Sequence, residues 1–304
     1  MPSLSFATVD VFTTTRFAGN PLAIVRIPQG QDVPTEQLQR IADEFNLSET
    51  VFLYESAADS REWRVRIFMV SFELPFAGHP TIGTACYALG TLADNAASGK
   101  FLCKAGPIGL DYSAGVAKAS IPHNVHIHTE HKFTLEQLYT FQPALKATKP
   151  PHAMNIISPV RGMNFLCVEL ASLEDLALVK VTGIRPSAQL DTDWDVGFTA
   201  SYFYVVMHQP GDRRPERLDV RTRMIEGTME DPATGSAACG LCALLATDGK
   251  HPDLAVSIVQ GVEMGRRSEI GVDVRLMGPD WEAVETIHLS GSAVKVMEGT
   301  VEYD

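Results

Sequence analysis

Two segments of this sequence share one pattern: Gly78-His-Pro-Thr-Ile-Gly83 and Gly235-Ser-Ala-Ala-Cys-Gly240. In each, two glycines enclose four residues, and the chain continues into an apolar segment rich in small residues. This pattern is typical of a turn that leads from a strand into a buried helix. The two stretches therefore predict a duplicated fold with one central helix in each half.

A second pair of similar segments precedes the two turns. Val65-Arg66 lies upstream of the first turn and Val220-Arg221 upstream of the second, each followed shortly by a methionine. The offset between the copies drifts from 155 residues at these segments to 157 at the glycines, so a two-residue insertion has to be allowed. The pattern indicates a weak internal repeat in which each half is a strand-rich lobe.

The rest of the chain predicts mostly strands. Phe6–Phe12 and Pro21–Ile27 are typical of a hairpin, while apolar residues at helical spacing after Pro34 predict a helix that ends near Asn46. Alternating, Gly-punctuated runs near the end predict successive antiparallel strands. We expect an α+β fold of two similar lobes, each a β-barrel-like, mostly antiparallel sheet around a central helix. The expected lobes are residues 1–125, completed by a strand at 291–304, and residues 126–290.

Composition excludes several classes of function. The chain has 304 residues, enough for about two domains, and a net charge of −12, which opposes binding to nucleic acid or to an anionic membrane. No apolar stretch approaches the ~18 residues that a spanning helix needs, and no signal peptide is evident. Five cysteines is an odd and sparse number that suits a reducing compartment. We therefore expect a cytoplasmic protein.

The two glycine turns are candidates for binding an anion. A helix N-terminus presents N–H groups and a positive partial charge, and Gly78 and Gly235 would let a ligand approach the backbone closely. If both helix starts face one ligand, they would bind a carboxylate without Lys or Arg. The alternative is that both are simple strand-to-helix turns.

Candidate acid and base residues lie beside these turns. His79 and Ser236 follow the two glycines, Asp231 precedes the second turn, and Glu49 lies at a helix-to-strand junction. The pKa of a histidine side chain is ordinarily near neutrality, and burial raises the pKa of a carboxyl group toward neutral pH. Structural alternatives remain for three of them: a helix N-cap for Asp231, a solvated junction residue for Glu49, and a hydrogen-bonded first-turn residue for His79.

Other chemistries are less well supported. Cys239 and Cys242 lie one turn apart and form a lone C-x-x-C, for which apolar packing is the better interpretation. The histidines in the run from His123 to His131 could hold a metal, but a polar, solvated linker is the better interpretation. A Ser-His-Asp hydrolase lacks the G-x-S-x-G elbow, and no phosphate loop or dinucleotide motif is present. We expect neither a metal nor a cofactor.

Four ordered motifs resemble one family. They are Ala-Gly-Asn-Pro-Leu-Ala-Ile-Val at 18–25, Asn-Leu-Ser-Glu-Thr-Val-Phe-Leu at 46–53, Glu-Leu-Pro-Phe-Ala-Gly-His-Pro-Thr-Ile-Gly-Thr-Ala at 73–85, and Asp-Pro-Ala-Thr-Gly-Ser-Ala-Ala-Cys-Gly-Leu at 231–241. Together they resemble the PhzF-like family of phenazine-biosynthesis-type isomerases, over nearly the whole chain. The resemblance implies a fold like that of diaminopimelate epimerase, with the site in a cleft between two lobes.

The resemblance also implies roles for residues. Glu49 matches the family's acid/base, and His79, Asp231 and Ser236 match the residues that complete its site. Gly78, His79, Gly235 and Ser236 match the helix starts that hold a substrate carboxylate. The best-known member isomerises trans-2,3-dihydro-3-hydroxyanthranilate without a cofactor, and family members often form homodimers.

Three places depart from the family pattern. Gly265-Arg-Arg-Ser268 stands where the family has Gly-Arg-Pro-Ser, and Met69-Val-Ser-Phe72 stands where it often has Thr-Pro. Ala77 and Pro232 align with the two cysteines of the epimerases, so racemisation by two thiols is disfavoured. The first two departures leave the identity of the substrate open.

The sequence thus predicts a cofactor-independent isomerase. It moves a proton on a small carboxylate-bearing substrate by general acid/base catalysis from Glu49. Two alternatives stay open: an amino-acid epimerase or racemase with bases other than Cys, and a non-catalytic small-molecule-binding protein on the same scaffold.

Overall fold

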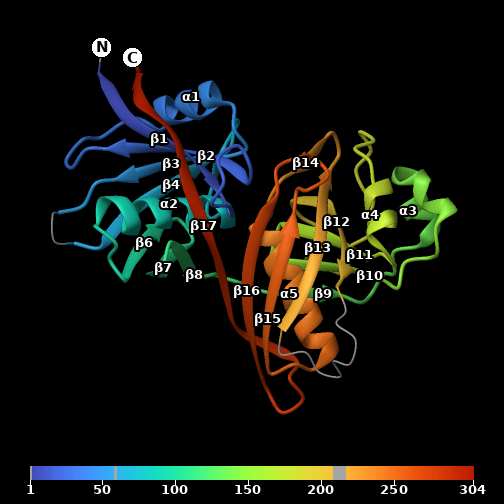
Figure 1. The fold of residues 1–304 in the computed structure, drawn as a ribbon. Helices are drawn as coiled ribbons and strands as arrows, with labels where there is room; N and C mark the ends of the chain where they lie inside the picture. Colours follow the sequence, from blue (N-terminus) through green and yellow to red (C-terminus); the bar gives the residue numbers. More distant parts are fainter. Residues whose placement is uncertain (1, 58–59, 208–216) are drawn as a thin grey trace. The chain divides into compact units, whose positions relative to one another are not determined.

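The computed structural model describes residues 2–57, 60–207 and 217–304. The chain divides into two compact units (Figure 1). Unit 1 comprises Met1–Ile121 together with Leu289–Asp304, and unit 2 comprises Pro122–His288. The two ends of the chain lie side by side in unit 1, where Ser3 pairs with Glu302.

Unit 1 is a closed ring of eight strands. β1 pairs with β2 on one side and with β17 on the other, and the ring continues through β3, β4, β6, β7 and β8 back to β17. The pairs β2–β3 and β4–β6 are parallel. The elements are β1 (Ser3–Val11), β2 (Asn20–Ile27), α1 (Thr35–Phe45), β3 (Thr50–Tyr54), β4 (Glu62–Phe68), β5 (Glu73–Leu74), α2 (Gly78–Ala85), η1 (Cys86–Leu92), β6 (Ser98–Cys103), β7 (Gly106–Ser113), β8 (Val116–Ser120) and β17 (Ala283–Glu302).

Helix α2 is the central helix of unit 1. It contacts β1, β2, β3 and β8, and all eight of its residues are buried. Gly83 makes this close packing possible, because a Cβ there would lie 2.5 Å from Cγ2 of Val11 and 2.8 Å from Cδ2 of Leu22. Helix α1 instead covers the outer face of the sheet, where Leu38 and Ile41 pack with Phe52 and Phe68.

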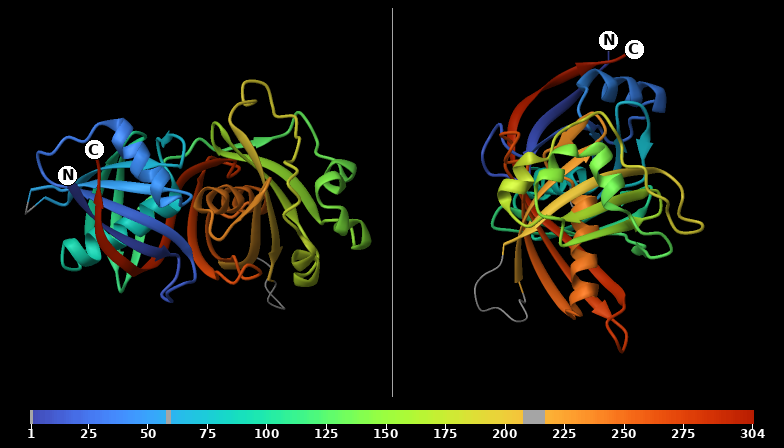
Figure 2. Two further views of the ribbon diagram at one scale, coloured as in Figure 1. Left: turned by 90° about the horizontal axis from the view of Figure 1, so that it is seen from above. Right: turned by 90° about the vertical axis from the view of Figure 1, so that its right-hand side faces the viewer.

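Unit 2 has the same connectivity. Its strands pair in the order β9, β10, β11, β12, β13, β15 and β16, with β11–β12 and β13–β15 parallel. Figure 2 shows α5 along its axis with strands around it, and ten of its residues are buried. The elements are β9 (His126–His128), α3 (Leu135–Phe141), η2 (Pro143–Ala147), β10 (Ala153–Val160), β11 (Met163–Glu169), α4 (Leu173–Leu178), β12 (Phe198–Val206), β13 (Arg217–Glu226), β14 (Met229–Asp231), α5 (Gly235–Gly249), β15 (Asp253–Gln260) and β16 (Ser268–Met277).

The strand register corrects the predicted offset of the repeat. Phe68 pairs with Glu73 between β4 and β5, and Ile225 pairs with Glu230 between β13 and β14. Both pairs differ by 157 residues, as do the two glycine turns, so the two-residue insertion expected from the sequence is wrong. Val65-Arg66 is therefore structurally equivalent to Thr222-Arg223, two positions after the Val220-Arg221 that the sequence pattern matched to it.

An ion pair repeats at the same offset. Arg66 binds both carboxylate oxygens of Glu73 at 2.9 Å, and Arg223 binds those of Glu230 at 2.8 and 2.7 Å. Such two-point pairing fixes orientation as well as distance. Each pair therefore anchors the short strand that leads into the central helix of its unit.

Among the described residues, no helix is both long enough and apolar enough to cross a membrane.

Candidate functional site

Glu49 lies between the end of α1 and the start of β3. Asn46 ends the helix in a left-handed conformation, with φ of 50°, and the chain enters β3 four residues later, at Thr50. The Glu49 side chain is 15% exposed, yet its Oε2 atom is buried and makes no hydrogen bond within the described part of the chain. Burial raises the pKa of Glu49 to about 7, against a hydrogen bond from Ser48 that lowers it.

His79 is the second residue of α2 and faces Glu49. Its side chain is 5% exposed, and its Nε2 lies 3.6 Å from Oε2 of Glu49. The structure therefore brings together two of the predicted site residues, from a strand start and a helix start. Glu49 is not the solvated junction residue that was the structural alternative.

The start of α2 carries no side-chain cap. Its N-cap is Ala77, and Pro80 in the first turn has no N–H. The backbone amides that begin this helix are therefore those of Gly78 and His79. An uncapped first turn directs its positive partial charge toward whatever lies in front of it.

The start of α5 is built around Asp231. This residue is 8% exposed at the end of β14, and Oγ1 of Thr234 donates a hydrogen bond of 2.6 Å to its Oδ2. Thr234, not Asp231, is the N-cap of α5, so the alternative of Asp231 as a cap is wrong. Gly235 and the half-buried Ser236 follow as the first two helical residues.

Gln260 connects this end of α5 to the core of unit 2. Its Nε2 donates to the backbone oxygen of Asp231 at 2.8 Å and to Oγ1 of Thr234 at 3.0 Å. Its Oε1 accepts from the hydroxyl of Tyr202 at 3.0 Å. Both Gln260 and Tyr202 are fully buried. A glutamine at the end of the apolar, alternating strand β15 is the only local signal of this role.

The cysteines do not form a site. The offset of 157 places Thr234, rather than Pro232, opposite Ala77, so the alignment expected from the sequence is wrong by two residues at this point. Neither Ala77 nor Thr234 is a cysteine, which leaves the argument against two-thiol racemisation intact. Cys239 and Cys242 are buried in α5, and burial raises the pKa of the Cys239 thiol to about 12, as in inert core cysteines.

Two histidines of the predicted linker form a cluster with Asp191. Ligand atoms of His126, His128 and Asp191 lie within 4.8 Å of one another, as in a metal site. These atoms are already hydrogen-bonded: the backbone N–H groups of Thr129 and Glu130 donate to the Asp191 carboxylate, and that of Asp191 donates to Nδ1 of His128. The cluster therefore connects β9 to the segment around Asp191 by hydrogen bonds.

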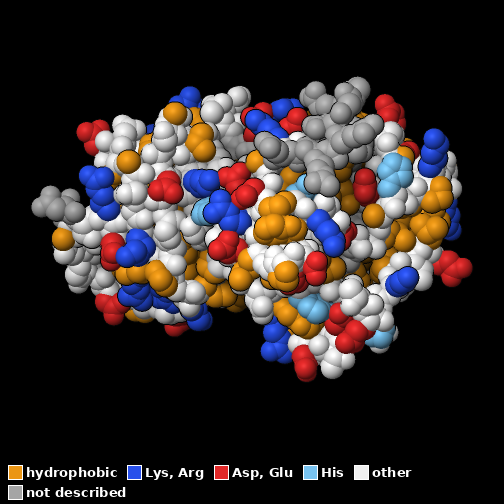
Figure 3. Space-filling view, turned by 90° about the horizontal axis from the view of Figure 1, so that it is seen from below, with side chains coloured by type: hydrophobic (Ala, Val, Ile, Leu, Met, Phe, Trp, Pro, Cys, Tyr) orange, Lys and Arg blue, Asp and Glu red, His pale blue; other side chains and the backbone are white. Residues whose placement is uncertain are grey.

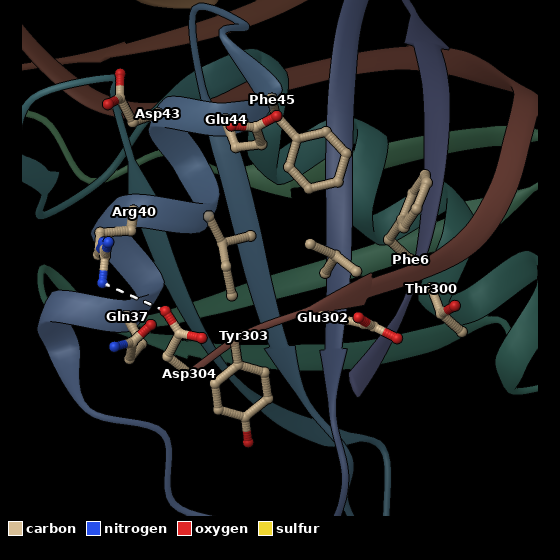
Figure 4. Close-up of a pocket in the computed structure, with 12 residues that line it drawn as sticks. Phe6, Gln37, Arg40, Asp43, Glu44, Phe45, Thr300, Glu302, Tyr303 and Asp304 are labelled. Carbon is tan, nitrogen blue, oxygen red and sulfur yellow. Dashed lines mark ion pairs between the residues drawn. The ribbon is translucent and has the colours of Figure 1, made fainter. Parts of the chain in front are cut away.

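A groove in unit 1 lies apart from these residues. Figure 4 shows it between α1 and the end of β17, with Phe6 and Phe45 packed edge to face at one side. Arg40 and Asp304 form a loose ion pair of 3.9 Å across it. None of the predicted site residues lines the groove.

Charges of both signs are interspersed on the face drawn in Figure 3. Lys and Arg side chains stand next to Asp and Glu side chains there, and no broad basic field covers the described residues of that face.

Comparison with known proteins places the chain in a family. A family model for phenazine biosynthesis-like proteins, PhzC-PhzF, matches residues 9–299. The chain belongs to this family. Among curated relatives, an uncharacterized isomerase of Mesorhizobium japonicum is 31% identical over 98% of this chain and 99% of that protein. A trans-2,3-dihydro-3-hydroxyanthranilate isomerase of Pseudomonas aeruginosa is 28% identical over 97% of this chain and 98% of that protein.

Solved structures show the same fold. A PhzF-family phenazine biosynthesis protein of Bacillus anthracis superposes with a TM-score of 0.77 at 22% identity, covering 99% of this chain and 100% of that one. The predicted PhzF-like fold and membership are thus confirmed. The expectation of an enzyme, an isomerase of the PhzF-like family, is confirmed as well.

Proposed function

We propose that this PhzF-like enzyme isomerises a small carboxylate-bearing substrate by moving a proton between two carbon atoms, without a cofactor. The observation that carries the proposal is Glu49: a buried carboxyl group with a pKa of about 7, 3.6 Å from His79. A general acid/base works best when its pKa is close to the pH at which it operates. Burial brings the pKa of Glu49 close to neutral pH.

The proton transfer balances within one residue and one substrate. The Glu49 carboxylate takes a proton from one carbon, and the electron pair of the broken C–H bond shifts into the adjoining double-bond system. The resulting carboxylic acid returns the proton to a second carbon of the same system. Glu49 regains its charge, and the substrate is rearranged without being oxidised or reduced.

The other predicted residues have supporting roles in this proposal. His79, beside Glu49, orients the carboxyl group, and Asp231 and Ser236 complete the site. The helix starts at Gly78 and Gly235 bind the substrate carboxylate. Backbone dipoles suit this task because the net charge of −12 opposes an anion at long range. That a single ligand reaches both helix starts stays a prediction.

The substrate resembles trans-2,3-dihydro-3-hydroxyanthranilate in this proposal, a compound named for several relatives at 28–29% identity. We also propose that the enzyme acts as a cytoplasmic homodimer. The resemblance to the family and the five unpaired cysteines support these two points.

The test uses Glu49→Gln, which keeps the shape of the side chain and removes its acid/base chemistry. With trans-2,3-dihydro-3-hydroxyanthranilate in D₂O, the wild type should form the isomer, and kcat/KM should rise with pH through about 7 as Glu49 ionises. Glu49→Gln should fold normally and lose at least ~10²-fold in turnover.

Glu44→Gln, an exposed substitution on α1, is the matched control and should keep the wild-type rate. Full turnover by Glu49→Gln would overturn the role of Glu49. Binding of the compound without turnover by the wild type would overturn the choice of substrate.

A further inference from the structure

The turn between β4 and β5 is held firmly in place. The backbone N–H of Met69 donates to the oxygen of Phe72 at 2.8 Å. Gln39 on α1 donates its Nε2 protons to the backbone oxygens of both Met69 and Val70 at 2.9 Å. Three of the four side chains of this turn are apolar, and Phe72 is 52% exposed. The chain therefore fixes the backbone of a turn that presents apolar groups.

Glu49 and Met69 directly adjoin the last residue pair of β3 and β4. Thr50 pairs with Phe68 between β3 and β4, so continuing the antiparallel register by one residue sets Glu49 opposite Met69. Opposed residues have Cβ atoms about 5 Å apart and share a face of the sheet. Phe68 packs on the α1 face, so Glu49 and Met69 lie on the other face, toward α2.

Leu22 lies on the other side of Glu49. β2 and β3 are parallel with Ala23 level with Thr50, which sets Leu22 level with Glu49. Leu22 is fully buried against Gly83 of α2. The extended register thus sets Glu49 between Leu22 of the core and the half-buried Met69, and the imidazole of His79 lies 3.6 Å from its carboxyl group.

Two arginines of these strands are already paired with carboxylates. Arg26 of β2 shares the face of Leu22 by strand alternation, four residues further along, and forms an ion pair with Glu55. Arg66 of β4 hydrogen-bonds to Thr35 of α1 and binds Glu73. The titratable side chain facing Glu49 is His79, from α2. The environment of the Glu49 carboxyl group therefore depends on how well apolar side chains keep water from it.

We propose that Met69 is a positioning residue for Glu49, whose thioether side chain covers the carboxyl group on its solvent side. Leu22 belongs to the core, so Met69 is the neighbour that separates the carboxyl group from water. The buried, unpartnered Oε2 atom of Glu49 supports this arrangement.

Met69 also narrows the class of substrate, a consequence that rests on the proposed function of Glu49. A thioether offers no strong hydrogen bond. The substrate should therefore present an apolar edge, rather than a hydroxyl or an amine, beside the carbon that exchanges its proton. Its carboxylate has to lie elsewhere, at the helix starts.

The test measures the titration of Glu49 in the unliganded protein by ¹³C NMR of the carboxyl groups, with the signal assigned by its loss in Glu49→Gln. Met69→Thr should lower the titration midpoint by about one pH unit, which is a tenfold change in the ionisation equilibrium. Met69→Leu should restore the wild-type midpoint. Met277→Thr, at a half-exposed methionine of β16, is the matched control and should have no effect.

Gln39→Ala provides a second route if Met69→Thr does not fold. It removes both hydrogen bonds to the turn and should shift the midpoint in the same direction. An unchanged midpoint in Met69→Thr, or in Gln39→Ala where Met69→Thr is unfolded, overturns the proposal. The titration requires no turnover, so it is independent of whether Glu49→Gln inactivates the enzyme.

Discussion

Glu49 combines two properties that oppose each other, a buried position and a need to ionise. Its folded pKa of about 7 lies above the value near 4.5 of an unperturbed glutamate. Between these values the folded chain binds more protons than the unfolded chain. The stability associated with protonated Glu49 is therefore fully present below pH 4.5 and is lost as the pH rises through 7.

The stability of Glu49→Gln should depend on pH differently from that of the wild type. Between pH 4.5 and 8, the free energy of unfolding of the variant should rise relative to wild type by up to roughly 3 kcal/mol, because glutamine carries no charge that must be buried. Urea unfolding at several pH values measures the difference. Parallel curves for the two proteins would contradict the raised pKa, and Glu44→Gln should show no such trend.

At the scale of elements, the two central helices differ in how closely neighbouring side chains approach them. Gly83 and Gly240 occupy equivalent positions in α2 and α5. A Cβ at Gly83 would meet side chains of β1 and β2 within 2.5–2.8 Å, whereas one at Gly240 would meet Ile157 and Pro159 at 3.4 Å. Contacts under 3 Å force the neighbours to move, while contacts at 3.4 Å are close to normal packing.

Gly83→Ala should therefore lower the free energy of unfolding by about 1–3 kcal/mol, because overpacking outweighs the gain in helix propensity. Gly240→Ala is the matched variant and should be neutral or stabilising by up to ~1 kcal/mol. Chemical denaturation of both variants checks this. Equal effects would show that the packing around the two helices does not differ as described.

At the scale of the whole molecule, β17 contributes to both units. Residues up to His288 belong to unit 2, and residues from Leu289 onward belong to unit 1, where they pair with β1 and close the ring. The ring of unit 1 is thus completed by a strand distant in sequence. A sheet that loses such a strand exposes two unpaired edges.

Removal of residues 293–304 should selectively destabilise unit 1. Backbone amides of β1 and β8 should lose protection from hydrogen exchange, while those of β10 to β15 keep it. Mass spectrometry of peptides from the exchanged protein measures this. A chain lacking only Tyr303 and Asp304 keeps every residue pair between β1 and β17, from Ser3–Glu302 to Val11–Ala293, and should resemble the full chain. Unchanged protection in β1 would contradict the role of β17.

Local patterns were sufficient to predict the glycine turns, the residues around them and the helix that ends at Asn46. They also brought out Glu49 and His79, which the structure places 3.6 Å apart. They could not reveal Gln260, whose contacts depend on β15 pairing with β13 and on α5 beginning at Thr234. The repeat offset failed for a related reason: Arg66 and Arg223 are matched by their ion pairs rather than by their neighbours in sequence.

The path of β17 also has a consequence for the order in which the chain folds during synthesis. Residues 122–288 form a contiguous unit, so unit 2 has all its strands as soon as these residues leave the ribosome. Unit 1 has most of its chain earlier, but its ring stays open until residues 293–302 are made. Unit 1 is therefore synthesised first but closes last. Until then β1 and β8 have unpaired edges, and such edges are binding sites for chaperones that act on nascent chains.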